Sequence, residues 1–237
     1  NNIGLFGRTG TSCEIHDLTL ADAYIEGYDN VGGFVGYSYN GGEGSYRKPI
    51  YGVIANCKFL NGVIKGRNSV GGIIGFFLTD YDFYNSTNIS NCSFQNGDIN
   101  GNDYVGGIVG YIDTEMETEI DGCCFQNGNI NGYNEIGGIA GYVKQSNQDI
   151  NFVRCYSTNC TIIGNNNLGG ILGKYYGYER ISSCFSNVKI YGIGSIGGLI
   201  GSHESTSTGS HIKNSYSTGL IEGENNLGGI VGINSRW

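Results

Sequence analysis

Apolar and polar positions along this chain form short blocks, and residues 92–110 contain one such block. Apolar and polar side chains alternate around Ile99, and an apolar run then continues from Val105 to Val109 across two glycines. Alternation over a few residues predicts a strand with one buried face, and a short apolar run bounded by Gly predicts a second strand. The segment from Cys92 to Phe94 predicts a third. Helix signals are nearly absent from the chain.

The same block occurs seven times, which makes the chain a repeat array. In every copy an Ile lies two residues before a Gly, and this Gly lies five residues before a Gly pair. Three short strands per copy predict one coil of a parallel β-solenoid, so the fold class is all-β with about seven coils and variable insertions on one side. We expect residues 1–237 to form a single solenoid domain that is part of a longer chain. Its copies end near Gly7, Gly36, Gly75, Gly110, Gly141, Gly173, Gly201 and Gly232.

Stacked coils bring equal repeat positions above one another, so each position becomes a ladder along the rod. The core is expected to contain an isoleucine ladder of Ile25, Ile64, Ile99, Ile130, Ile162, Ile190 and Ile221. A cysteine ladder of Cys13, Cys57, Cys92, Cys123, Cys155 and Cys184 runs beside it. We expect these thiols to pack as small buried hydrophobes; a metal or disulfide ladder is the alternative. Cys124 is expected to point outward as the most reactive thiol.

The apolar residue that follows each Gly pair has two possible environments. These residues are Phe34, Ile73, Ile108, Ile139, Ile171, Leu199 and Ile230. A straight strand would expose them as an apolar stripe suited to self-association. A bend or bulge at the Gly pair would turn them inward, and this is the arrangement we favour. Glycines at the corners are expected to supply positive φ angles and tight turns.

Composition limits the classes of partner. The chain has 43 Gly and a single Pro in 237 residues, with a net charge of −8. An acidic chain does not suit nucleic acid, which selects basic surfaces, so we expect no nucleic-acid partner. No run of 18 apolar residues is present, so we expect no membrane span.

The motif Val/Ile/Leu-Gly-Gly-x-x-Gly, preceded at residues 214–223 by Asn-Ser-Tyr-Ser-Thr-Gly-Leu-Ile-Glu-Gly, resembles the GLUG repeat. The resemblance covers essentially the whole chain. This family occurs in bacterial surface and secreted proteins, including some immunoglobulin A-cleaving proteases and adhesin-like proteins. The resemblance therefore implies an extracellular or cell-surface module, and it implies no reaction. The cysteine ladder and the long early insertions depart from the family pattern.

The segments between the closing Gly of one copy and the Cys of the next vary in length and are rich in Tyr. Insertions on one side of a solenoid often form its binding face, and Tyr suits contacts with sugars and proteins. Tyr37, Phe76, Tyr111 and Tyr142 directly follow a closing Gly and are expected to form a structural ladder. The candidate ligand-binding residues are Tyr46, Tyr51, Tyr81, Phe83, Tyr84, Tyr175, Tyr176 and Tyr178.

Metal binding and catalysis have fewer candidates. An alternating acidic run could bind Ca²⁺ or form a solvated strand edge, and we favour the edge; it comprises Asp113, Glu115, Glu117, Glu119 and Asp121. The three histidines are scattered, so we expect no catalytic site and no cofactor. The predicted function is a structural or adhesive module that binds glycan or protein. The alternatives are a filament subunit that stacks end to end and a polysaccharide-acting β-helix enzyme, with Asp80 and Asp82 as its acidic pair.

Overall fold

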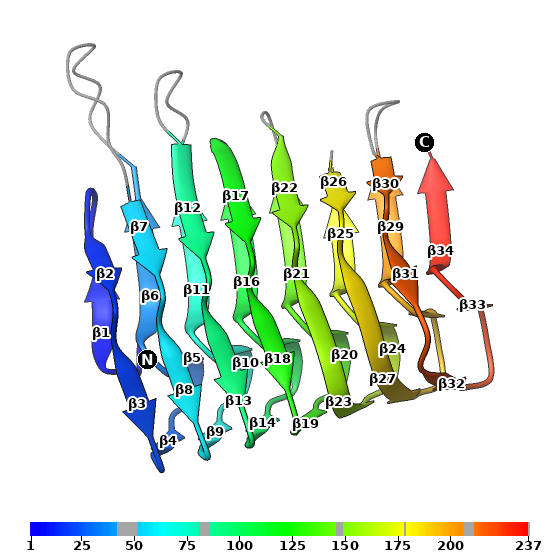
Figure 1. Ribbon diagram of the computed structural model, residues 1–237, viewed down its shortest axis with the longest axis horizontal. Helices are drawn as coiled ribbons and strands as arrows, with labels where there is room; N and C mark the ends of the chain where they lie inside the picture. The colour runs from blue at the N-terminus through cyan, green and yellow to red at the C-terminus, as the bar shows by residue number, and fades with distance from the viewer. Residues whose placement is uncertain (42–51, 81–85, 146–148, 178, 206–210, 237) are drawn as a thin grey trace.

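The computed structural model describes residues 1–41, 52–80, 86–145, 149–177, 179–205 and 211–236. In these residues the regular structure consists of 34 short strands, which stack as a parallel β-solenoid (Figure 1). The predicted fold class is therefore confirmed. The described part of the chain contains no helix that is long and apolar enough to cross a membrane.

Each of the four coils that begin between Cys13 and Cys123 contains five short strands, where the sequence predicted three; in the coils that begin at Cys155 and Cys184 the first two strands merge into one, β23 (Tyr156–Ile163) or β27 (Phe185–Tyr191). In the coil that begins at Cys92 the five strands are β13 (Ser93–Gln95), β14 (Asp98–Asn100), β15 (Asp103–Gly106), β16 (Val109–Thr114) and β17 (Glu117–Asp121). The chain bends immediately after β15, which divides the predicted Gly-pair strand into two. The fifth strand, β17, lies in the variable segment.

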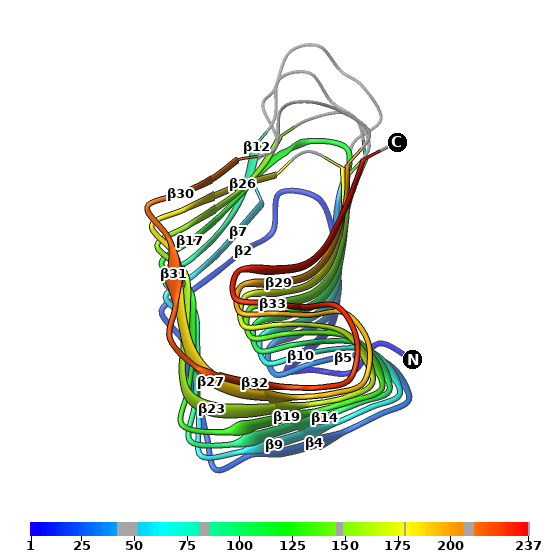
Figure 2. The same cartoon turned by 90° about the vertical axis from the view of Figure 1, so that its right-hand side faces the viewer.

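Equivalent strands of successive coils form four parallel sheets, which surround the core (Figure 2). The eight-stranded sheet contains β1 (Phe6–Thr9), β6 (Val35–Asn40), β11 (Ile74–Thr79), β16, β21 (Ala140–Gln145), β25 (Leu172–Tyr176), β29 (Ile200–Ser205) and β34 (Val231–Arg236). The glycine sheet, whose strands end at the first Gly of each pair, contains β5 (Asp29–Gly32), β10 (Asn68–Gly71), β15, β20 (Asn134–Gly137), β24 (Asn166–Gly169), β28 (Ile196–Gly197) and β33 (Leu227–Gly228).

The other two sheets lie on either side of the cysteine ladder. The pre-cysteine sheet contains β2 (Glu14–His16), β7 (Gly52–Ala55), β12 (Ser86–Ser90), β17, β22 (Ile150–Val153), β26 (Glu179–Ser182) and β30 (His211–Lys213). The twelve-stranded sheet contains β3 (Thr19–Ala21), β4 (Tyr24–Glu26), β8 (Lys58–Leu60), β9 (Val63–Lys65), β13, β14, β18 (Cys124–Gln126), β19 (Asn129–Asn131), β23 (Tyr156–Ile163), β27 (Phe185–Tyr191), β31 (Tyr216–Ser217) and β32 (Leu220–Glu222).

The isoleucine ladder lies in register through the core. Ile99 pairs with Ile64 on one side and with Ile130 on the other, and the series continues to both ends of the rod. The five inner members of the ladder are fully buried, whereas Ile25 and Ile221 in the outer coils are partly buried. A coil gains this burial only from its neighbours, so the stack is the unit of stability.

Corners of the coils are formed mainly by residues other than Gly. Positive φ angles occur at Asn56 and Asn91 directly before ladder cysteines, at Asn214 before Ser215 in the equivalent position, and at Asn61 and Asn96 after the cysteines. Asn tolerates this left-handed conformation better than most residues. Among the described glycines only Gly122 and Gly177 have positive φ angles, so the expectation that glycines supply the positive φ angles of the corners was wrong.

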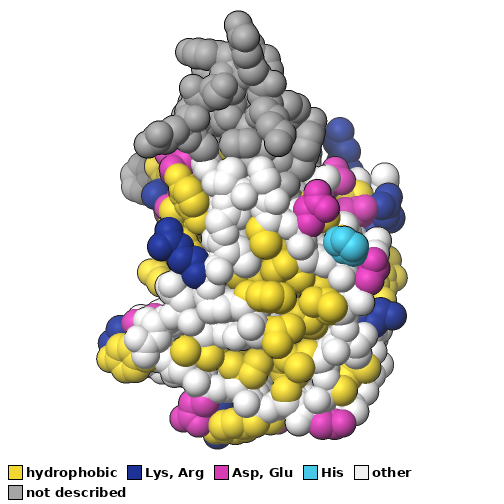
Figure 3. Space-filling model, turned by 90° about the vertical axis from the view of Figure 1, so that its left-hand side faces the viewer, with side chains coloured by type: hydrophobic (Ala, Val, Ile, Leu, Met, Phe, Trp, Pro, Cys, Tyr) yellow, Lys and Arg dark blue, Asp and Glu magenta, His cyan; other side chains and the backbone are white. Residues whose placement is uncertain are grey.

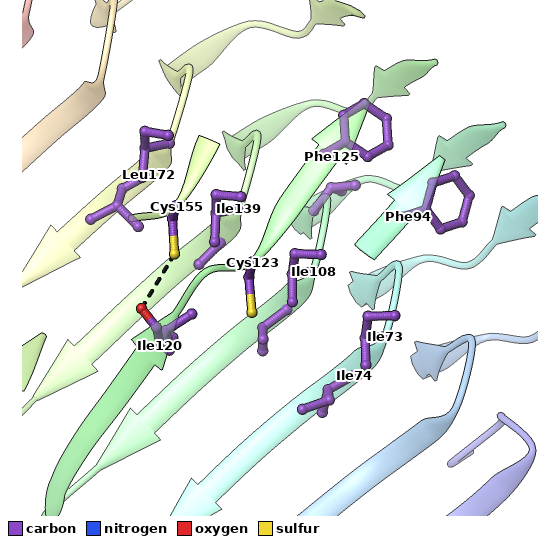
Figure 4. Packing of buried hydrophobic residues seen from close by; sticks show 14 of the residues in the cluster. Ile73, Ile74, Phe94, Ile108, Ile120, Cys123, Phe125, Ile139, Cys155 and Leu172 are labelled. Carbon is purple, nitrogen blue, oxygen red and sulfur yellow. Dashed lines mark hydrogen bonds between the residues drawn. The ribbon is translucent and has the colours of Figure 1, made fainter. Parts of the chain in front are cut away.

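The Gly pairs instead allow close approach between backbones. A Cβ atom at Gly107 would lie 2.0 Å from the carbonyl oxygen of Gly138 in the next coil, well inside the contact distance of the two atoms. The bend at each pair also turns both following apolar residues inward: Ile73 and Ile74 are fully buried beside Ile108 (Figure 4). The post-glycine ladder is therefore core from Phe34 to Leu199, with only terminal Ile230 exposed, and it does not form an exposed stripe for self-association.

Candidate functional site

The variable segments join the eight-stranded sheet to the pre-cysteine sheet. The strands β6, β11, β16, β21 and β29 all end at the same side of the rod, and the pre-cysteine strands begin there (Figures 1 and 2). Sequence-variable surface is therefore gathered on one side, next to the outer face of the eight-stranded sheet. This side is the natural place to search for a binding site.

Most of the predicted ligand-binding residues lie outside the described residues: Tyr46, Tyr51, Tyr81, Phe83, Tyr84 and Tyr178. Tyr175 is described and fully buried, in register with Val143 and His203. Its ring belongs to the core, so its assignment as a ligand-binding residue was wrong. The neighbouring residue in β25, Tyr176, is exposed on the surface.

An aromatic column covers the outer face of the eight-stranded sheet, as the sequence predicted. It consists of Tyr37, Phe76, Tyr111 and Tyr142, one residue from each of four successive coils. Ring centroids lie 5.3, 4.7 and 5.1 Å apart along the column, and the last three rings are stacked. Because Phe76, Tyr111 and Tyr142 stack face to face, this part of the column presents ring edges to the surroundings.

Tyr104 extends this column sideways, and the sequence reasoning missed it. Its ring lies 5.2 Å from Tyr111 and 5.4 Å from Tyr142, although Tyr104 belongs to the glycine sheet. Its backbone has a φ of 60°, at a repeat position that holds Asn30, Ser69, Glu135 or Asn167 in other coils. A single aromatic residue in an otherwise polar column was the available signal.

Charged groups surround the aromatic rings. Lys174 follows Tyr142 in the column, lies 5.9 Å from the centroid of its ring and forms an ion pair of 2.9 Å with Glu204. Lys144 pairs with Asp113 at 3.0 Å. Arg8 lies 5.3 Å from the centroid of Tyr37 at the other end. We call these rings, together with Tyr104 and the charged groups beside them, the aromatic face.

Burial changes the ionisation of the aromatic face. Desolvation is the main cause of the raised pKa of Tyr142, which is about 12, and it also raises the pKa of Tyr111. Both phenols therefore stay protonated at neutral pH and can donate hydrogen bonds. This combination of aromatic edges, hydroxyl donors, carboxylates and ammonium groups suits a polar ligand with apolar patches, such as a sugar chain or a protein loop.

Glu135 gives the aromatic face a pH dependence that can be measured. Burial raises its pKa above the usual value of 4.5, although Nδ2 of Asn167 donates a hydrogen bond of 3.0 Å to its carboxylate. A raised pKa in the folded state means that stability is highest when the group is protonated and falls as the pH rises through that pKa. We therefore expect the wild type to lose stability relative to Glu135→Gln as the pH is raised above about 4.5.

Urea denaturation of the wild type and Glu135→Gln at several pH values measures this difference. Asp98→Asn is a suitable control, since it removes a carboxylate from another sheet. A stability difference between the wild type and Glu135→Gln that stays constant between acidic and neutral pH would contradict the prediction.

The acidic run does not form the candidate Ca²⁺ site. Asp113 lies near the end of β16, and Glu115 lies in a bend at residues 115–116. This bend separates Asp113 from Glu117, Glu119 and Asp121 in β17. Lys144 pairs with Asp113 and Arg154 pairs with Asp121. Within the described ranges, no three His, Cys, Asp or Glu side chains are placed to hold a metal ion. The solvated, ion-paired edge is the arrangement found.

The cysteine ladder is a column of free thiols. Cys123 and Cys155 are fully buried, and the Sγ of Cys155 donates to the carbonyl oxygen of Ile120 at 3.2 Å (Figure 4). All eight cysteines are free, and all except Cys13 are buried.

In the first coil Leu18 takes the ladder position next to Cys57, whereas Cys13 precedes β2 one strand earlier, so the assignment of Cys13 to the ladder was wrong. Cys124 shares the register of Tyr156 on the outer face, but it is covered there, and burial raises the pKa of its thiol, so the expectation that it is the most reactive cysteine was wrong.

Thiol alkylation of the native chain should accordingly stop at Cys13. A buried, protonated thiol is a poor nucleophile and is reached only after local opening. We expect iodoacetamide to modify one cysteine of the native protein and all eight after unfolding in urea, as counted by mass spectrometry. Fast native alkylation of Cys124 would show that its part of the twelve-stranded sheet is open to solvent.

Comparison with known proteins adds no assignment to this geometry. No family model matches the chain, and no curated protein and no solved structure matches it. The resemblance to the GLUG repeat accordingly stays a prediction from the residues. Any function must be argued from the surface of the solenoid.

Proposed function

We propose that this chain is a binding module of an extracellular or cell-surface protein, which displays its Tyr-rich variable segments and the aromatic face to a glycan or protein. The observation that carries the proposal is that the variable segments follow the ends of the same strands whose outer face carries the aromatic column. A stacked solenoid fixes the positions of its surface residues, which lowers the entropy lost on binding. The GLUG resemblance supports the location.

A matched loop exchange tests this proposal. Residues 81–85 read Tyr-Asp-Phe-Tyr-Asn, and the variable segment at 206–210 reads Thr-Ser-Thr-Gly-Ser. Copying the second sequence into positions 81–85 removes three aromatic residues at constant length. Wild type and variant are applied to an array of glycans and extracellular-matrix proteins. Binding by the wild type that the exchange variant loses supports recognition through the Tyr-rich segments.

Tyr142→Ser and Tyr104→Ser extend the test to the aromatic face, with Tyr24→Ser as a control. Tyr24 is well exposed but lies in the twelve-stranded sheet, at the far side of the coil. Weaker binding by the first two variants with unchanged binding by Tyr24→Ser would place the ligand on the aromatic face. Absence of binding by the wild type to every glycan and protein on the array would count against the module.

A filament subunit that stacks end to end is the second candidate. The N-terminal coil presents a hydrophobic surface that includes Leu5 and Phe6, which are 54% and 40% exposed (Figure 3). The C-terminal coil exposes Leu220 and Leu227 to a similar degree. In-register pairing between copies would cover both, since unpaired strand edges attract further strands. Electron microscopy separates the two candidates: rods of one short length favour the module, and fibres of indefinite length favour the filament.

A further inference from the structure

Each coil from Cys57 onward has an aromatic residue one or two positions after the cysteine-ladder position. Along the rod this aromatic side chain moves from the core to the outer face. In the earlier coils Phe59, Phe94 and Phe125 point into the core and are fully buried. In the last three coils the same register position holds a Ser. The residue before it becomes aromatic and lies on the outer face: Tyr156, Phe185 and Tyr216 stack with centroids 5.0 and 5.3 Å apart. The buried hydroxyls of Ser157 and Ser186 donate to the carbonyl oxygens of Gly170 and Gly198, so the core position stays hydrogen-bonded while the aromatic ring moves to the surface.

A ladder of asparagines ends in the same region. Asn61, Asn96, Asn127 and Asn159 occupy one corner, and each amide donates to the carbonyl of the previous Asn at 3.2 to 3.3 Å. The next strand, β27, is one residue shorter here, so Thr158 pairs with Asn187 and Cys160 with Val188. Asn159 therefore has no counterpart in the next coil. The surface steps inward directly beyond it.

This step forms a depression of about 350 Å³ on the outer face of the twelve-stranded sheet. It is lined by residues 159–161, 187–189 and 218–220 from three successive coils. The volume lies within the range of small-ligand sites, which begins at roughly 300 Å³. The strands that contribute to its lining, β23, β27 and β32, lie away from the side where the variable segments leave the coils (Figure 2).

The lining combines hydrogen-bonding groups with one positive charge. Asn159 and Asn187 supply amides, Thr161 and Thr218 supply hydroxyls, and Lys189 supplies an ammonium group. The lining contains no carboxylate, although the whole chain has a net charge of −8. Lys189 is therefore a local positive centre that faces no opposite charge within the depression.

Apolar groups complete the lining. Cys160, Val188 and Leu220 belong to it, and burial raises the pKa of the Cys160 thiol to about 12, so this thiol stays neutral. The stacked rings of Tyr156 and Phe185 begin their strands a few residues away on the same outer face. Apolar patches beside amides and hydroxyls suit the mixed surface of a sugar ring.

We propose that this depression binds a saccharide that carries a carboxylate, such as a uronic acid. The amides and hydroxyls bind the sugar hydroxyls, and the Lys189 ammonium pairs with the carboxylate. A charge-assisted hydrogen bond of this kind is stronger than a neutral one. The site is separate from the aromatic face and the variable segments, so it does not depend on the function proposed for them.

Titration of the ¹⁵N-labelled chain with galacturonate, and separately with neutral galactose, tests the site. Galacturonate is expected to shift the amide signals of residues 187–189 and 218–220, and to bind about tenfold more tightly than galactose, the ratio that corresponds to roughly 1.4 kcal/mol. Equal affinity for the two sugars, or no shift at these residues with either, would overturn the proposal.

Variants separate the charge from the shape of the site. Lys189→Gln is expected to remove the preference for galacturonate, while Lys58→Gln, an exposed Lys of the same sheet outside the depression, should retain it. Asn187→Trp is expected to fill the depression and abolish binding of both sugars, with amide signals of distant coils unchanged. Retention of the galacturonate preference in Lys189→Gln would contradict the assignment of the carboxylate to this Lys.

Discussion

Replacing Gly107 with Ala is expected to prevent the chain from folding to its native solenoid. The added Cβ would lie 2.0 Å from the carbonyl oxygen of Gly138 and 2.7 Å from the Cβ of Phe125. Neither neighbour can retreat easily, because Gly138 sits in the bend of the next coil and Phe125 is fully buried. Relief would require separating two coils, which would expose the ladders on both sides of the gap.

Gly229→Ala is the matched control, because Gly229 occupies the same repeat position in the last coil. A Cβ at Gly229 would meet no atom within 4 Å. We expect this variant to unfold within about 0.5 kcal/mol of the wild type, as surface substitutions commonly do. Circular dichroism and urea denaturation of both variants measure the contrast. Cooperative unfolding of Gly107→Ala at wild-type stability would show that close approach at the Gly pair is not required.

The sequence was sufficient to predict the solenoid and its principal ladders. Ile99 and its equivalents recur at a fixed distance from a Gly pair, and only stacking in register can bury such a series. Tyr111 and Tyr142 were likewise predictable as neighbours, since each directly follows a closing Gly. In a stacked fold, repeat position translates directly into contact along the rod.

Contacts between residues at different repeat positions were harder to predict from the sequence. Tyr104 reaches Tyr111 because the chain bends between them, and the bend angle is set by close packing of the Gly pair. Tyr175 was assigned to the surface because it lies in a variable segment, yet β25 continues far enough to bury it. Cys124 follows a buried Cys, and alternation predicted exposure, but its thiol is covered on the outer face, where it lies in register with Tyr156. Repeat spacing does not encode where a strand stops or turns.

The candidate binding surfaces also divide into features that the repeat predicts and features that it does not. The one-sided placement of the variable segments follows from the repeat, because every coil must return to the same cross-section. The depression at Asn187 lies instead where β27 has one residue fewer than β23, which the repeat does not predict. Departures from a repeat carry as much information as the repeat itself, and they concentrate in the last three coils of this chain.

Phe94→Ala is expected to destabilise the solenoid by about 3–5 kcal/mol, the usual cost of deleting a buried aromatic ring. Phe94 is fully buried and stacks on Phe59 at 4.8 Å and on Phe125 at 5.5 Å, so the variant loses two ring contacts and leaves a cavity between coils. The free energy of unfolding from urea denaturation measures the loss.

Phe185→Ala is the comparison for Phe94→Ala, because it removes a stacked ring from the surface instead of from the core. Phe185 also lies between two rings, Tyr156 and Tyr216, but its stack lies on the outer face, where it is only partly buried. We expect its removal to cost about 0.5–1.5 kcal/mol for each lost aromatic pair, without the penalty of a core cavity. If both variants lost the same free energy of unfolding, the outer stack would stabilise the fold as much as the buried stack does. A clear difference would mean that the last three coils keep rings on their surface for a purpose other than stability.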